Sequence, residues 1–256
     1  MSNAPVLVAT VDGIGTITLN RADKRNALDS ATIDGIRIAI AELELEREVR
    51  VIVLRSDGPD FCAGADLAQL ERIAAGADSM ENVSDAQQLG DLFVRMRRGT
   101  KPIIAAVQGS AIAGGAGLAG ACDIILAADN AVFGYPEVHL GFVPAMVMAL
   151  LRRSVGEKVA FELVARGERI GADEAHRIGL VNRVYPAKDF NEAVTTYATE
   201  LARRSPSAIA LTKRLLYGMD GMSFEEAIAR GAEVNAIARA TDDCREGVRR
   251  FLEKKR

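Results

Sequence analysis

The chain has 256 residues, of which 49% are hydrophobic and 26% charged, as in one globular domain with or without an appendage. Its 32 basic and 35 acidic residues give a formal net charge of −3, too weak a field to gather nucleic acid or anionic lipid. The three cysteines are widely spaced and only two histidines occur, which excludes a disulfide framework, a zinc spacing and a histidine-rich metal site. No signal peptide is apparent. We therefore expect a cytoplasmic protein that binds no metal, nucleic acid or membrane.

Strands and helices are predicted to alternate in the first half of the chain. Two β-rich runs, Val6–Val11 and Gly15–Leu19, flank the hairpin signal Asp12-Gly13. Apolar residues at helical spacing predict a helix over Asp29–Leu45. The near-continuous apolar run Val49–Arg55 is typical of a buried parallel strand.

The middle of the chain continues this alternation. A helix is expected from about Asp66, followed by a mobile loop over residues 74–85, which are rich in Ala, Gly, Asp, Ser and Asn. Gln87–Arg98 is predicted to be helical, and Pro102–Val107 and Ile124–Ala128 to be buried strands. Short strands that alternate with longer helices indicate an α/β fold.

From Asp173 onward the pattern becomes mostly helical. Ser223-Phe-Glu-Glu is a capping box at the start of one of these helices. We divide the chain into an α/β core, residues 1–200, and a C-terminal helical region, residues 201–256, which packs within the chain or against another subunit. The predicted helical segments are Asp173–Ile178, Phe190–Arg203, Pro206–Tyr217, Ser223–Ala240 and Asp242–Lys254.

A turn between a strand and a helix, Phe61-Cys-Ala-Gly-Ala-Asp-Leu67, is the first candidate site. Gly64 allows a tight turn. Backbone N–H groups at a helix N-terminus are unpaired and favour negative charge, and the small side chains let a ligand approach them. The alternative is a plain strand-to-helix turn that binds nothing.

The second candidate site is the glycine- and alanine-rich stretch Gln108–Gly120, which permits close approach of the backbone to a ligand or another element. Within it, Gly115-Ala-Gly-Leu-Ala-Gly120 matches G-x-G-x-x-G, the pattern of dinucleotide sites. The next strand, Ile124–Ala128, starts too soon for a full crossover helix, which needs roughly a dozen residues with its loops. No acidic residue ends that strand to hold a ribose. We therefore do not expect a nucleotide.

Glu137, in Phe133-Gly-Tyr-Pro-Glu137, is the third candidate. It lies in an otherwise apolar, turn-forming stretch, residues 132–147. A carboxylate there is either an exposed turn residue or a positioned acid/base whose pKa is raised by burial. His139, two residues further on, either orients a substrate or simply packs at a turn.

Taken together, these segments resemble the enoyl-CoA hydratase/isomerase family, also called the crotonase family. The likeness extends over nearly the whole chain, and it rests on the order and spacing of the motifs rather than on any one of them. The motifs are Asn20-Arg-Ala-Asp-Lys-Arg-Asn-Ala-Leu28, Phe61-Cys-Ala-Gly-Ala-Asp66, Lys101-Pro-Ile-Ile-Ala-Ala-Val-Gln-Gly109, Ala113-Gly-Gly115, Ala121-Cys-Asp123, Phe133-Gly-Tyr-Pro-Glu137 and Glu174-Ala-His-Arg-Ile-Gly-Leu-Val181.

The resemblance implies a crotonase-like spiral of β-β-α turns, with a C-terminal helical region that packs subunits into homotrimers, often paired into hexamers. It implies an acyl-CoA substrate, as in fatty acid metabolism, and no cofactor beyond the coenzyme A that the substrate carries. The expected reaction is enoyl-CoA isomerisation or hydration, so the enzyme would be an isomerase or a lyase.

The resemblance also implies site residues. The family's oxyanion hole maps onto the N–H groups of Ala65 and Gly114, which would hold the thioester oxygen as it gains charge, with roughly 3–4 kcal/mol from each. Glu137 would be the acid/base. Coenzyme A would lie along Ala63–Leu67, with its phosphates near Lys24 or Arg25. The full predicted binding set is Lys24, Arg25, Ala63, Ala65, Asp66, Leu67 and Gly114.

Two departures from the family pattern bear on the reaction. Family hydratases carry a second glutamate where this sequence has Gly117, so we expect two-carboxylate hydration to be impaired and isomerisation by Glu137 alone to be favoured. Gly117→Glu would restore a carboxylate if the helix can accept it. Ala145 stands where family hydratases have a glycine. A related group of hydrolases has an aspartate at this position, so the absence of an aspartate here argues against a hydrolase.

Three functional classes remain open on the sequence. The first is an enoyl-CoA isomerase or hydratase. The second is another crotonase-type reaction, such as acyl-CoA decarboxylation or thioester hydrolysis, that needs only the oxyanion hole. The third is a non-catalytic acyl-CoA-binding protein, against which the presence of Glu137 argues.

Overall fold

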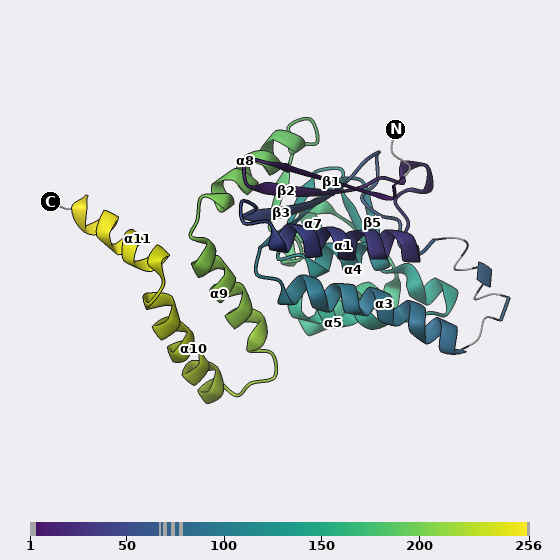
Figure 1. Cartoon of the computed structure of the whole chain (residues 1–256). Coiled ribbons are helices and arrows are strands. Elements are labelled where there is room, and N and C mark those ends of the chain that lie inside the picture. The colour runs from purple at the N-terminus through teal and green to yellow at the C-terminus, as the bar shows by residue number, and fades with distance from the viewer. Residues whose placement is uncertain (1–3, 67, 69–70, 73–74, 77–78, 255–256) are drawn as a thin grey trace.

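A six-stranded sheet lies at the centre of the structure, a computed structural model that describes residues 4–66, 68, 71–72, 75–76 and 79–254 (Figure 1). Its strands, in the order in which they pair, are β1 (Val6–Val11), β2 (Ile14–Leu19), β3 (Val51–Ser56), β4 (Ile103–Val107), β6 (Ile124–Ala128) and β9 (Arg183–Tyr185). β1 and β2 are antiparallel, and the other neighbours are parallel. A smaller sheet contains β5 (Ser110–Ile112), β7 (Val132–Gly134) and β8 (Arg169–Gly171).

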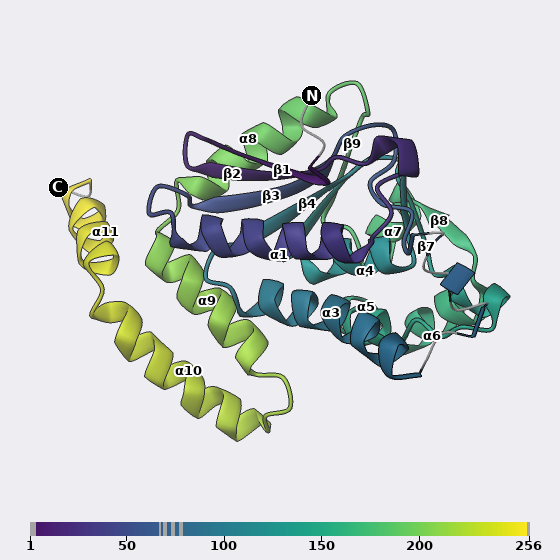
Figure 2. The ribbon, with the colours of Figure 1, turned by 45° about the vertical axis from the view of Figure 1, so that its right-hand side comes forward.

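Helices cover both faces of the large sheet, as Figure 2 shows. On one face lies α8 (Phe190–Ala202), and on the other lie α1 (Ser30–Leu45), α3 (Ser79–Arg98) and α4 (Gly114–Ala121). The α/β fold predicted from the alternating pattern is therefore confirmed. The remaining helices are η1 (Ala22–Lys24), η2 (Pro136–Leu140), α5 (Ala145–Ser154), α6 (Glu157–Arg166), α7 (Ala172–Arg177), α9 (Pro206–Gly218), α10 (Phe224–Arg239) and α11 (Asp242–Glu253).

The central strands are buried on both faces, which explains their continuous apolar runs. In β3, Ile52 and Leu54 belong to the core beneath α1, α3 and α4. The alternate residues Val51 and Val53 pack with α8, including Phe190. Alternate side chains of the strand therefore face two different cores, and this explains why Val51–Leu54 is apolar throughout.

The structure confirms the sequence signals for one hairpin turn and for the starts of two helices. Asp12 and Gly13 both have positive φ, +49° and +79°, as the tight β1–β2 hairpin requires. The side chain of Asp29 caps α1 by accepting a hydrogen bond from the N–H of Thr32 (2.8 Å). α10 begins with the predicted capping box of Ser223 and Glu226. The sequence-based helix boundaries in this C-terminal part agree with the structure to within one or two residues.

The predicted loop at residues 74–85 is wrong from Ser79 onward, because α3 begins at that residue rather than at Gln87. Met80 and Val83 are exposed, so this first part of the helix carries no apolar stripe that faces the core. Residues 74, 77 and 78 lie outside the described residues. Of the helix predicted from about Asp66, positions 68 and 71–72 are described, and they are helical.

The glycine-rich stretch contains a helix that its local residue pattern does not indicate, although the family resemblance places Gly117 on a helix. α4 spans eight residues. It fits between β4 and β6 because the chain first forms β5 in the small sheet, and because glycine and alanine let the helix pack closely. Gly115, Gly117 and Gly120 lie inside α4 rather than in a turn before a helix. The stretch therefore holds a short helix of eight residues rather than a turn that precedes a full crossover helix.

Helices α9, α10 and α11 form a C-terminal arm that leaves the core (Figures 1 and 2). α10 lies beside α9, and α11 contacts both. Among the arm residues that the structure describes, only Lys213 and Val234 are buried. Large apolar side chains stay exposed instead, namely Leu216, Met222, Phe224, Ile228, Ile237, Val248, Phe251 and Leu252. None of the helices in the described ranges is long and apolar enough to span a lipid bilayer.

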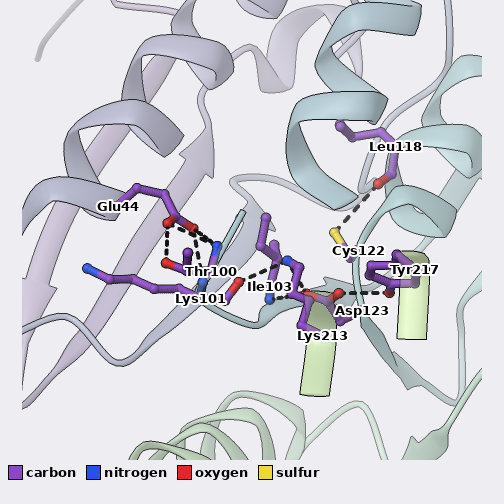
Figure 3. A network of polar contacts seen from close by, with 9 residues as sticks. All are labelled: Glu44, Thr100, Lys101, Ile103, Leu118, Cys122, Asp123, Lys213 and Tyr217. Atoms are coloured by element: carbon purple, nitrogen blue, oxygen red, sulfur yellow. Dashed lines mark hydrogen bonds and ion pairs between the residues drawn. The ribbon is translucent and has the colours of Figure 1, made fainter. Parts of the chain in front are cut away.

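A polar network docks α9 onto the core, as Figure 3 shows. The Lys213 ammonium donates to Asp123 Oδ2 (2.8 Å) and to the carbonyl of Lys101 (2.9 Å). Asp123 also accepts the hydroxyl of Tyr217 (2.7 Å) and the N–H of Ile103 (2.7 Å). One carboxylate therefore joins α9 to the start of β4, with each oxygen satisfied.

The loop that supplies the carbonyl acceptor is itself fixed by α1. Glu44 accepts hydrogen bonds from the hydroxyl of Thr100 (2.6 Å) and from the N–H of Lys101 (3.0 Å) (Figure 3). On the other side, the guanidinium of Arg97 stacks over the ring of Tyr217 at 3.8 Å. These contacts fix the positions of α1, α3 and α9 relative to one another.

We expect Lys213→Met to lower the free energy of unfolding by about 2–4 kcal/mol, since it leaves the largely buried Asp123 carboxylate without its cation. Urea denaturation measures the change. Lys158→Met, at an exposed position of α6, is the matched control and should change stability by less than about 0.5 kcal/mol. Equal effects of the two variants would contradict a docking role for the pair.

Candidate active site

The small-residue turn between β3 and α3 is held by hydrogen bonds on both sides. The N–H of Cys62 donates to the carbonyl of Ser110 (2.9 Å), and the N–H of Ile112 donates to the carbonyl of Cys62 (3.0 Å). On the other side, the N–H of Leu28 donates to the carbonyl of Gly64 (2.7 Å). Cys62 thus forms an isolated parallel bridge with Ala111 of β5, so the turn is not a free loop.

Glycines bring this turn against the start of α4. Gly64 has φ +95°, and a Cβ added there would lie 2.9 Å from the carbonyl oxygen of Ile112. A Cβ added at Gly115 would lie 2.3 Å from the carbonyl oxygen of Cys62. Real Cβ atoms do not come so close to a backbone oxygen, so the two segments pack backbone to backbone only because both positions are glycine.

This packing brings together two free backbone donors, the N–H groups of Ala65 and Gly114. Neither has an acceptor among the described residues. Gly114 is the first residue of α4, where helical N–H groups lack intrahelical partners. Ala113 before it has φ +51° and donates its own N–H to the carbonyl of Gly134 (2.8 Å). A Cβ added at Gly64 would lie 3.7 Å from the nitrogen of Gly114, which shows how close the turn and the helix start are.

Glu137 follows β7 in the short helix η2, and the Ala113–Gly134 hydrogen bond ties that strand to the start of α4. Its Oε2 atom is buried and has no hydrogen-bond partner among the described residues. Burial raises the pKa of this carboxyl above its ordinary value of 4.5, partly offset by the residue's own backbone N–H. An unsatisfied buried carboxylate oxygen is costly for stability, and such groups concentrate where proton transfer occurs.

Gly117 lies one helical turn after Gly114 and cannot take a larger side chain as the structure stands. A Cβ there would lie 2.6 Å from Val147 Cγ2 and 3.0 Å from the ring of Phe93. The expectation that Gly117→Glu might restore a carboxylate therefore meets a steric obstacle, because α5 and α3 fill the space beside the helix.

A pocket of about 300 Å³ opens on the side of the turn predicted to bind coenzyme A. Asp66 lies in its wall and is held by Arg21 at 2.8 Å, with Lys24 at 3.9 Å. A hydrogen bond from the N–H of Ala68, and then Arg21 and Lys24, lower the pKa of Asp66. The lining residues are Lys24, Leu28, Asp29, Ser30, Ala31, Ile33, Asp66, Ala68, Arg72 and Gln88.

The two predicted phosphate-binding cations differ in position. Lys24 lines the pocket and is 55% exposed, so its ammonium is available to an anion. Arg25 instead pairs with Asp60 at 2.7 Å and donates to the hydroxyl of Ser110 (3.2 Å). Leu67, also predicted at this site, lies outside the described residues.

His139 is exposed on η2, beside Gly167, where a Cβ would lie 2.7 Å from its Nε2. Cys62 is fully buried at the turn, and burial raises the pKa of its thiol to about 12, so it stays protonated and is no nucleophile. In the part of the chain that the structure describes, no group of three or more His, Cys, Asp or Glu residues is placed to hold a metal ion.

Arg21 is a further residue of the candidate site, and the sequence analysis did not single it out. Its guanidinium donates to the carbonyl of Ala27 (2.7 Å) and pairs with Asp66 and Asp29 (3.1 Å). It thus clamps the pocket wall to the start of α1. The signal was present in the Asn20–Leu28 motif, but nothing in that motif separates a buried clamp from an exposed cation.

Comparison with known proteins agrees with this arrangement. Residues 9–256 match the family model described as enoyl-CoA hydratase/isomerase. A Thermus thermophilus protein, named provisionally as an enoyl-CoA hydratase, is 42% identical over 94% of this chain and 95% of its own length. The 2,3-dehydroadipyl-CoA hydratase of Escherichia coli K12 is 33% identical over 98% of this chain and 96% of its own.

Solved structures show the same fold. The crystal structure of an enoyl-CoA hydratase from Mycobacterium smegmatis superposes with a TM-score of 0.93 at 31% identity, covering 98% of this chain and 96% of that one. The expected crotonase fold is thereby confirmed. The chain belongs to the enoyl-CoA hydratase/isomerase family and is an acyl-CoA enzyme of that family.

Proposed function

We propose that the enzyme isomerises enoyl-CoA thioesters, with Glu137 as the acid/base. The N–H groups of Ala65 and Gly114 hold the thioester oxygen as it gains charge in the enolate. Glu137 takes a proton from C2 of a 3-enoyl-CoA and returns it to C4, which moves the double bond into conjugation. The observation that carries the proposal is the buried, unpartnered Oε2 of Glu137, since a desolvated carboxylate is a stronger base toward carbon.

The coenzyme A moiety is proposed to lie along Ala63–Asp66, with its phosphates toward Lys24. The exposed ammonium of Lys24 in the wall of the pocket supports this placement. Proton transfer between carbons of one substrate consumes no electrons, so the reaction needs neither nicotinamide nor metal. We therefore expect full turnover in the presence of a chelator.

Hydration is the second candidate reaction, because several relatives are named as hydratases. Hydration in this family is expected to use two carboxylates, and this chain has Gly117 at one of the two positions. Decarboxylation, thioester hydrolysis and non-catalytic binding remain as further alternatives. A panel of 2-enoyl, 3-enoyl, malonyl-type and saturated acyl-CoA substrates separates all of these.

The arm is proposed to pack against other copies of the chain in a homotrimer, or in a hexamer of two trimers. Phe224 and Ile228 are 75% and 60% exposed on α10, and Leu216 is 61% exposed on α9. Exposed apolar surface of this extent, along three helices that bury almost nothing, favours an interface over a solvated tail.

Glu137→Gln should lower turnover of the best 3-enoyl-CoA by roughly 10²–10⁴-fold, because the amide cannot accept the proton. Acyl-CoA affinity should stay nearly unchanged, since the coenzyme A contacts lie elsewhere. Steady-state kinetics and titration calorimetry measure the two quantities. His139→Gln, at an exposed position of the same short helix, is the matched control and should lower turnover less than about tenfold.

Near-normal turnover of the Glu137→Gln protein would show that the acid/base is elsewhere or that none is needed. A large loss in the His139→Gln protein with normal folding would move the proposed chemistry toward the histidine. Failure of every acyl-CoA to bind would remove the proposal altogether.

The acid limb of the kcat/KM profile should lie above pH 4.5, because burial raises the pKa of Glu137 and only its ionised form accepts a proton. The same shift means that the folded state favours the protonated carboxyl. That contribution to stability is present at low pH and lost as pH rises through the raised pKa. Glu137→Gln should therefore unfold at no lower a temperature than the wild type at neutral pH. An acid limb below pH 4.5 would contradict a raised pKa for the Glu137 carboxyl that accepts the proton.

Ile228→Glu should dissociate the assembly into smaller species, because it puts a charge into the proposed apolar interface. Light scattering after gel filtration measures the mass. Ile38→Glu is the matched control, since Ile38 is a 47% exposed isoleucine on α1 of the core and should leave the mass unchanged. A wild-type monomer at micromolar concentration would refute the trimer.

A further inference from the structure

Two apolar side chains close the space beside Gly117. Val147 of α5 brings its Cγ2 within 2.6 Å of where a Cβ on Gly117 would lie, and the ring of Phe93 of α3 comes within 3.0 Å. Val147 and Phe93 are each only 4% exposed. We call these two residues the apolar wall. It fills the volume that a side chain at position 117 would occupy.

The apolar wall lies next to the proposed oxyanion site. Residues three apart on a helix lie on the same face at about 5–6 Å, so Gly117 follows Gly114 directly along that face. A bound water needs two to four polar partners. Neither side chain of the wall has a polar atom to offer, and the N–H of Gly117 already donates to the carbonyl of Ala113 (3.0 Å).

We propose that Val147 and Phe93 are specificity-determining residues, which keep water off the face of the enoyl group beside Gly117 and so limit the enzyme to isomerisation. The proposal rests on the proposed function. In hydration the oxygen of water forms a bond to C3 and a proton is added at C2, so a positioned water is consumed. In isomerisation of a 3-enoyl-CoA a C2–H bond breaks and a C4–H bond forms, and no water is needed. A dry wall therefore selects between two reactions that each develop enolate charge on the thioester oxygen.

Val147 is the residue to change, because it makes the closer approach to position 117. Val147→Thr keeps the shape and adds one hydroxyl, which supplies one of the polar partners that a bound water needs. It should raise the ratio of hydration to isomerisation roughly three- to tenfold, the effect of one added hydrogen bond. Gly117→Glu/Val147→Ala removes the obstructing methyl groups and adds a carboxylate, and should raise the ratio by roughly 10²-fold. Gly117→Glu alone should give no such gain, because Val147 still fills the space.

The control is Leu150→Ala. Leu150 lies on the same helix and is 6% exposed, but its Cβ lies near Gly120, at 3.8 Å from a Cβ added there. It should lower stability without changing the ratio. Hydration is followed by the loss of conjugated 2-enoyl-CoA, and isomerisation by its appearance from 3-enoyl-CoA.

A second measurement needs no variant. Wild-type enzyme is given 3-enoyl-CoA that carries deuterium at C2, and the product is examined by mass spectrometry for deuterium at C4. With water excluded, more than roughly half of the label should stay in the product, because a closed site prevents proton leakage. Complete loss of label to the solvent, or an unchanged ratio in the folded Val147→Thr protein, would overturn the wall. Wild-type hydration as fast as isomerisation would overturn it too.

These outcomes are distinct from failure of the proposed function. If the wild type does not isomerise any 3-enoyl-CoA, the proposed reaction is wrong. Hydration that appears only in the two Val147 variants would then still support the wall.

Discussion

The backbone contact between the small-residue turn and the start of α4 sets the geometry of the whole site. A Cβ at Gly115 would lie 2.3 Å from the carbonyl oxygen of Cys62, so any other residue would force the two segments apart. Their close approach brings the N–H groups of Ala65 and Gly114 together while leaving both without an acceptor among the described residues. For the proposed function, backbone donors held in place beforehand need not reorganise when charge develops in front of them.

The sequence predicted those parts of the fold that have a strong local signal. Buried strands such as β3 were found because both faces are covered, and the β1–β2 hairpin because Asp12-Gly13 suits its turn. The three-residue strands of the small sheet are too short to show a period. The local residue pattern does not indicate α4, because glycine is a poor helix former, and packing against Cys62 and α5 stabilises this helix instead.

The sequence suggested the residues of the candidate site but not their environment. The order of motifs led to Ala65, Gly114 and Glu137, and the structure places all three on connected segments. The unpartnered oxygen of Glu137 could not be predicted, because it depends on which groups other elements leave nearby. For the same reason the contact of Val147 with Gly117 was invisible, since it requires α5 to lie against α4.

α4 also connects the site to the arm. Its first residue, Gly114, supplies one of the free donors, and Asp123 follows two residues after its last one. Asp123 is held by Lys213 and Tyr217 of α9 and by the N–H of Ile103. A helix of eight residues is only about 12 Å long, so the two ends of α4 are close together. α9 therefore docks just after the end of α4, and the start of α4 carries the N–H of Gly114. The arm and the candidate site are linked through this one short helix.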